Sequence, residues 1–176
     1  MTHVGWQQPI IHLDMDGVLA DLDRGIVEML NVEIESVERS AFFKSLLPEY
    51  TARRGFASQP KMPQAEELVD MCLRLHRDHK FSVAILTSAG QFYDPQSVVV
   101  YQKKVWLERE FPELAHVPFT ATSSGADKAM YAHSKSFLVD DHSANIQKFV
   151  ASGGWGVTYT PEVLDTLERT ILGSLS

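Results

Sequence analysis

Five short apolar runs, separated by segments of helical periodicity, constrain the fold of this chain more than any other sequence feature. Each run has four or five residues, too few for a buried helix, and most are rich in β-branched or aromatic residues. Strands that alternate with helices form a parallel sheet covered by helices. The sequence therefore predicts an α/β fold, a Rossmann-like three-layer sandwich. The runs are Ile10–Leu13, Ser82–Leu86, Val117–Thr120, Ser136–Val139 and Trp155–Tyr159.

One long segment, residues 21–63, interrupts this alternation. It contains two helix-like stretches, residues 25–30 and 36–47, followed by an irregular region. We predict that this segment is a small helical cap inserted after the first strand, and that residues 1–20 and 64–176 form the core domain. In the third run, Pro118 lacks a backbone donor, which favours an edge strand. The helices predicted for the core are Ala65–Arg77, Gln96–Glu110, Ser143–Ser152 and Pro161–Leu172.

The composition of the chain limits which partners it can bind and indicates its cellular compartment. The chain has 176 residues and a net charge of -7, which argues against a nucleic acid polymer or an anionic membrane as partner. Cys72 is the single cysteine, so no intramolecular disulfide can form, and its apolar helical context predicts a buried thiol. No run reaches the ~18 apolar residues of a membrane span, and residues 1–8 do not resemble a signal peptide. We therefore expect a cytoplasmic protein.

Polar clusters follow three of the predicted strands, where ligands of open α/β sheets bind. Asp14 and Asp16 follow the first strand and, being two residues apart, can face the same site. Thr87-Ser88 follows the second strand, and its hydroxyls and amides can hold phosphate oxygens. Asp140-Asp141 follows a buried strand, where two acids are costly without a cation. Asp14, Asp16 and Asp140 thus predict a Mg²⁺ site, and Lys128 is the candidate for neutralising a phosphoryl group.

These clusters resemble the four ordered motifs of the haloacid dehalogenase (HAD) superfamily. The resemblance implies that Asp14 attacks phosphorus and forms an aspartyl-phosphate. It implies that Asp16 is the acid–base residue and binds Mg²⁺ through its backbone carbonyl. It further implies that Thr87 binds the phosphoryl group, Lys128 stabilises it, and Asp140 ligates Mg²⁺. The matching residues are Asp14-Met15-Asp16-Gly17-Val18, Thr87-Ser88, Lys128 and Asp140-Asp141, where Asp141 ligates the metal directly or holds Lys128 or a metal-bound water.

A longer string, residues 14–21, resembles the 5'(3')-deoxyribonucleotidase branch, which hydrolyses nucleoside monophosphates. In that branch a helical cap supplies aromatic contacts to the base, and a lysine and a tryptophan lie at the substrate end. The resemblance therefore implies substrate contacts for Lys103, Phe56 and Trp106, next to Ser88 in the phosphate loop. Trp106 also fits core packing on its helix. Ala89 departs from the proline of that branch. Further similarities are Arg54-Gly55-Phe56, Tyr101–Trp106 and Asp127-Lys128.

The expected function is thus Mg²⁺-dependent hydrolysis of a nucleoside 5'- or 3'-monophosphate, preferentially a deoxyribonucleotide. Two alternatives stay open within enzymes: a phosphatase for another small phosphate, such as a sugar phosphate or phosphoglycolate, and a phosphotransferase. A third alternative is a non-catalytic phosphate-binding domain that has kept the fold. The presence of all four motifs, with their acids intact, argues against that third alternative.

Overall fold

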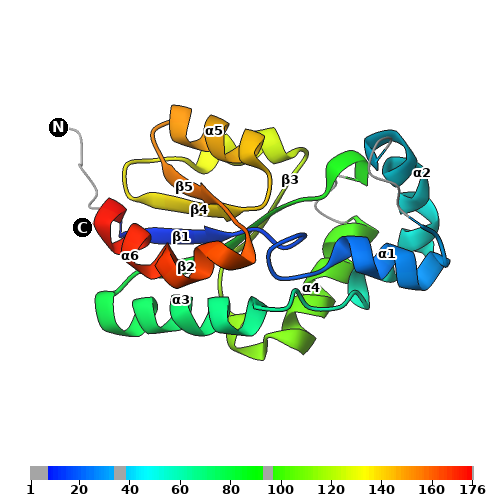
Figure 1. The fold of residues 1–176 in the computed structure, drawn as a ribbon, viewed down its shortest axis with the longest axis horizontal. Coiled ribbons are helices and arrows are strands. Elements are labelled where there is room, and N and C mark those ends of the chain that lie inside the picture. Colours follow the sequence, from blue (N-terminus) through cyan, green and yellow to red (C-terminus); the bar gives the residue numbers. More distant parts are fainter. Residues whose placement is uncertain (1–7, 34–38, 93–96, 176) are drawn as a thin grey trace.

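The computed structural model describes residues 8–33, 39–92 and 97–175, and its centre is a sheet of five parallel strands (Figure 1). The strand order is β3-β2-β1-β4-β5, so β1 lies in the middle and β3 at an edge, as Pro118 predicts. All five strands fall on the predicted runs. β2 continues through Ser88, and β3 begins after Pro118, whose carbonyl accepts from the Ile85 amide. The strands are β1 Ile10–Leu13, β2 Ser82–Ser88, β3 Phe119–Thr122, β4 Ser136–Asp140 and β5 Trp155–Thr158.

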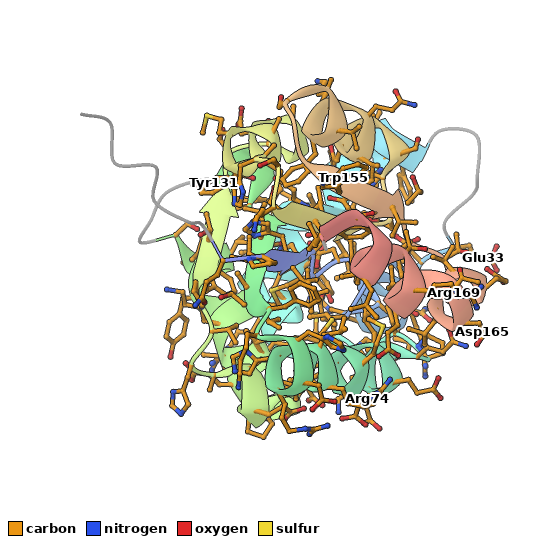
Figure 2. All side chains as sticks on the ribbon, turned by 90° about the vertical axis from the view of Figure 1, so that its left-hand side faces the viewer. Glu33, Arg74, Tyr131, Trp155, Asp165 and Arg169 are labelled. Atoms are coloured by element: carbon orange, nitrogen blue, oxygen red, sulfur yellow. The ribbon has the colours of Figure 1, made fainter. Side chains whose placement is uncertain are left out.

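Helices cover both faces of this sheet, which confirms the predicted three-layer α/β fold. Alternate side chains such as Leu13, Ile85 and Val139 pack in the main core with α3 (Ala65–His79) and α6 (Leu164–Leu175). Figure 2 shows these two helices at one end of the molecule, where Arg74 of α3 pairs with Glu168 of α6 at 3.1 Å. On the opposite face, Leu86 and Leu138 pack against α5 (Ser143–Ala151). The last long helix, α4, spans Val98–Glu110.

A helical insertion follows β1, as the sequence predicts. It contains α1 (Leu22–Leu30), α2 (Arg39–Ala52) and the 3₁₀ turn η1 (Gly55–Ala57). Of the helix-like stretch predicted at residues 36–47, residues 36–38 lie outside the described part of the chain. Figure 1 shows α1 and α2 on the side toward which β1 runs, near α4. A second apolar cluster, centred on Tyr50, joins the insertion to α4. The remaining 3₁₀ turns are η2 Gly90–Phe92, η3 Pro112–Leu114, η4 Gly125–Tyr131 and η5 Pro161–Val163.

Two further predictions from the sequence concern Cys72 and membrane-spanning helices. Cys72 is fully buried, and burial raises the pKa of its thiol to about 12, so the predicted buried thiol is confirmed. Within residues 8–33, 39–92 and 97–175, no helix is long and apolar enough to cross a membrane.

Candidate active site

A cavity of about 570 Å³ opens at the carboxyl ends of β1, β2 and β4. The three strands are neighbours in the sheet, and Leu13 is level with both Ile85 and Val139. The residues that follow each strand are therefore brought to one edge, and the Asp14 amide donates to the Val139 carbonyl at 3.0 Å. The sheet topology thus joins motifs that lie far apart in the sequence.

The cavity has two chemically different parts. One part, which we call the floor, is the polar group Asp14, Asp16, Ser88, Lys128 and Asp141; the insertion adds further charged residues such as Asp21 and Lys44. The apolar wall of the cavity, contributed mainly by the insertion, η2 and α4, consists of Leu22, Phe43, Leu47, Phe56, Phe92 and Val99. A ligand that fills the cavity therefore contacts both charged groups and aromatic surface.

Three carboxylates lie together: those of Asp14 and Asp141 on the floor and that of Asp140, which is fully buried beside it. Each offers an oxygen, and these oxygens lie within 4.8 Å of one another. Lys128 lies among them, with its Nζ 2.8 Å from Asp14 Oδ2 and 2.5 Å from Asp140 Oδ2. Burial opposes the charge of this ammonium, yet the two carboxylates hold the pKa of Lys128 above its ordinary value. The cluster thus combines three carboxylates with one ammonium group, and a cation would balance its excess negative charge.

Asp141 is an acid of this cluster with an uncompensated oxygen. Its Oδ1 is buried and accepts no hydrogen bond from the described part of the chain. Burial, followed by the charge of Asp14, raises the pKa of Asp141 to about 6. Burial and Asp14 likewise raise the pKa of Asp140, although Lys128 opposes the shift. Clustered carboxylate oxygens of this kind suit a hard cation such as Mg²⁺.

Gly17 allows Asp141 to reach this position. Its φ of +78° lies in the left-handed region that favours glycine. A Cβ at this residue would also lie 2.3 Å from Asp141 Oδ2. Both the backbone conformation and the close approach of Asp141 therefore favour glycine here.

Asp16 lines the cavity, but its carboxylate is not part of the three-acid cluster. Its Oδ2 accepts from Lys103 Nζ at 2.6 Å, and its Oδ1 accepts from Gln59 Nε2 at 3.2 Å. Among side chains, the cluster thus contains Asp141 rather than Asp16. The metal contact expected through the Asp16 backbone carbonyl stays a prediction.

The residues expected at the substrate occupy three different kinds of position. Ser88 lies on the floor and Phe56 on the wall. Thr87 is fully buried beside the floor, where its Oγ1 accepts from Lys103 at 2.9 Å. Lys103 lies behind the floor rather than on the cavity surface, with its Nζ 5.5 Å from the centre of the Phe56 ring.

Trp106 requires a correction. The expected substrate contact does not exist in this structure, because the side chain is fully buried and does not line the cavity. Its indole N–H donates to the Gln59 carbonyl at 2.7 Å, and its ring packs edge-on against Phe111. Trp106 is therefore a core residue that fixes the segment after η1.

Two residues of the site were not found from the sequence. Asn145, in the first turn of α5, donates to both carboxylate oxygens of Asp140 at 3.1 Å. Its place five residues after Asp140, at a helix start after a strand, is a signal that could have found it. Gln59 contacts Asp16 across 43 positions of sequence and carries no local signal.

Comparison with known proteins supports the fold assignment. No protein-family model and no curated protein matches the sequence. Solved structures do match: a HAD-superfamily hydrolase from Ehrlichia chaffeensis has 11% identity and a TM-score of 0.55, covering 97% of this chain and 99% of that chain. A haloacid dehalogenase-like hydrolase from Xanthomonas campestris has 11% identity and a TM-score of 0.58, with coverages of 99% and 95%.

A third structure contains ligands. It is an aspartate-to-alanine mutant of a HAD family enzyme from Bacteroides thetaiotaomicron, in complex with magnesium and inorganic phosphate. Its identity to this chain is 14% and its TM-score 0.53, and the match covers 88% of this chain and 95% of that one. The chain therefore has the Rossmann-like α/β fold of the HAD-superfamily hydrolases.

Proposed function

We propose that this protein is a Mg²⁺-dependent phosphomonoesterase that uses Asp14 as its nucleophile. The observation that carries the proposal is the cluster of Asp14, Lys128 and Asp141 on the floor with the buried Asp140 beside them. One buried oxygen of Asp141 has no hydrogen-bond partner among the described residues. The magnesium and phosphate bound to the Bacteroides thetaiotaomicron relative support the same chemistry.

The reaction proceeds in two displacements. A carboxylate oxygen of Asp14 attacks phosphorus, the bond from phosphorus to the leaving oxygen breaks, and Asp16 gives its proton to that oxygen. Asp16 then takes a proton from water, whose oxygen attacks phosphorus and releases phosphate from Asp14. Lys128, 2.8 Å from Asp14 Oδ2, stabilises negative charge on the phosphoryl oxygens. Ser88 on the floor binds those oxygens, and the predicted contact of Thr87 requires its buried hydroxyl to become accessible to the phosphoryl group.

The carboxylates of Asp14 and Asp140, with Asp141 and the backbone carbonyl of Asp16, would hold Mg²⁺, which neutralises charge on the phosphoryl group. Asn145 fixes Asp140 for this role by donating to both of its oxygens. Lys128 contacts the same carboxylate at 2.5 Å and opposes the rise in its pKa that burial causes.

The substrate we propose is a nucleoside 5'- or 3'-monophosphate, preferentially a deoxyribonucleotide. The support is the apolar wall, in which Phe43, Phe56 and Phe92 offer aromatic surface to a planar base in the same cavity as the floor. We assign residues 21–63 as the cap that carries most of this wall. A sugar phosphate or phosphoglycolate would leave the wall without a partner, so we place these substrates second.

A panel of phosphomonoesters tests this proposal. We expect Mg²⁺-dependent release of phosphate from nucleoside monophosphates, abolished by EDTA and restored by Mg²⁺. We also expect kcat/KM for a deoxyribonucleotide to exceed that for phosphoglycolate and for a sugar phosphate. Equal rates across the panel would refute the nucleotide specificity, and the absence of hydrolysis of every ester would refute the enzyme assignment.

A further inference from the structure

The carboxylate of Asp16 is held from two sides by residues outside the four motifs. Lys103 of α4 donates to Oδ2 at 2.6 Å, and Gln59, which follows η1, donates to Oδ1 at 3.2 Å. The two donors come from different parts of the chain and meet only at this side chain. Each oxygen of Asp16 therefore has its own fixed donor.

Lys103 has no hydrogen left for a substrate. An ammonium group has three N–H donors. Its Nζ has three acceptors within reach: Asp16 Oδ2 at 2.6 Å, Thr87 Oγ1 at 2.9 Å and the Ser88 carbonyl at 2.8 Å. The side chain is fully buried and does not line the cavity. Its charge consequently acts on Asp16, and a role in direct substrate binding does not fit this geometry.

Gln59 is itself fixed from several directions. Its backbone carbonyl accepts from the indole of Trp106 at 2.7 Å, and its Oε1 accepts from the Tyr50 hydroxyl at 3.4 Å. Tyr50 fills a slot that two glycines leave open, because a Cβ at Gly25 or at Gly55 would lie 2.4 Å from its side chain. The Gln59 amide is thus aimed at Asp16 by packing within the insertion and α4.

We propose that Lys103 and Gln59 are positioning residues that hold the Asp16 carboxylate toward the leaving-group oxygen. This inference rests on the proposed function, in which Asp16 gives a proton to that oxygen. When the proton has left, the negative charge on Asp16 lies between the ammonium of Lys103 and the amide of Gln59. Because each carboxylate oxygen has its own donor, the side chain is held in one orientation toward the leaving-group oxygen.

This role makes the effect of substitution depend on the leaving group. The alcohol released from a nucleoside 5'-monophosphate is a poor leaving group and needs a proton as the bond breaks. The 4-nitrophenolate released from 4-nitrophenyl phosphate leaves without one. Loss of proton donation therefore slows the first substrate much more than the second, whereas a general loss of structure slows both alike.

The experiment compares Lys103→Met and Gln59→Met with the wild-type chain on these two substrates. We expect Lys103→Met to lower kcat for the nucleotide by about 10²-fold or more, and for 4-nitrophenyl phosphate by less than about 10-fold. Gln59→Met should show the same pattern with a smaller loss, about 10-fold on the nucleotide. Lys104→Met, at the next residue of α4, and Gln102→Met, a buried glutamine that donates to the Thr51 carbonyl instead, are the matched controls.

A double-mutant cycle separates positioning from other roles. In an Asp16→Asn background, Lys103→Met should cause no further loss that depends on the leaving group. Equal losses on both substrates, or a raised KM with unchanged kcat, would overturn the inference while leaving the phosphatase assignment intact. Failure of the wild-type chain to hydrolyse either ester would overturn both. If Lys103→Met does not fold, Lys103→Gln, which keeps a donor, and Gln59→Met decide the question by the same ratio.

Discussion

The floor and the wall of the cavity differ in what holds their side chains in place. On the floor, Asp14 and Lys128 are buried and joined by short ion pairs to neighbours on other strands and turns. On the wall, Phe43 and Leu47 belong to α2, are only half-buried and are held by apolar packing alone. Charged groups with fixed partners are suited to catalysis, which needs a constant geometry. Apolar groups that can adapt are suited to binding the leaving group and so to substrate specificity.

The largest effect on activity is expected from a substitution in the three-acid cluster. We expect Asp140→Asn to lower kcat by about 10³-fold, because it removes one carboxylate from the metal cluster and one charge partner from Lys128. Steady-state kinetics with saturating Mg²⁺ provide the measurement, and Asp70→Asn on the exposed side of α3 is the control. Activity within a few-fold of wild type would exclude Asp140 from the site.

A change beside the floor should separate metal binding from stability. Gly17→Ala places a Cβ against Asp141 and strains a backbone at φ +78°, so we expect the Mg²⁺ concentration for half-maximal activity to rise about 10-fold or more. We also expect about 1–2 kcal/mol less free energy of unfolding, measured with urea. Gly153→Ala, at φ +95° with open space around it, should show the stability loss alone. An unchanged Mg²⁺ requirement in Gly17→Ala would contradict the placement of Asp141 at the metal.

A change at the wall should affect substrate choice rather than chemistry. We expect Phe43→Ala to raise KM for a nucleoside monophosphate by about 3–10-fold, the worth of one aromatic contact, with little change for phosphoglycolate. Phe42→Ala, the exposed neighbour that does not line the cavity, is the matched control. Parallel changes for both substrates would show that the wall does not contact the leaving group.

The smallest effect concerns a residue remote from both regions. Burial raises the pKa of the Cys72 thiol to about 12, so at pH 8 the reactive thiolate is strongly disfavoured in the folded chain. A chromogenic disulfide reagent should react with Cys72 only after unfolding in guanidinium chloride. Fast reaction of the folded chain would mean that the α3 side of the core opens readily.

The floor and the strands could be predicted from the sequence because their signals are local. An apolar run such as Ser136–Val139 followed by two acids indicates both a buried strand and a site at its end. The direction of a helical side chain carries no such signal: Trp106 was expected at the substrate, but its face of α4 packs into the core. Gln59 was missed because its contact with Asp16 exists only once the insertion has folded against α4.

The central claim is that Asp14 becomes phosphorylated during turnover. Its most direct test is a rapid acid quench of the enzyme with a nucleoside monophosphate and Mg²⁺, followed by peptide mass spectrometry and borohydride reduction of the acyl phosphate. We predict one phosphoryl group on the peptide that contains Asp14, converted to homoserine at that residue, and none in Asp14→Asn. Phosphate on another residue, or undiminished turnover by Asp14→Asn, would contradict the account.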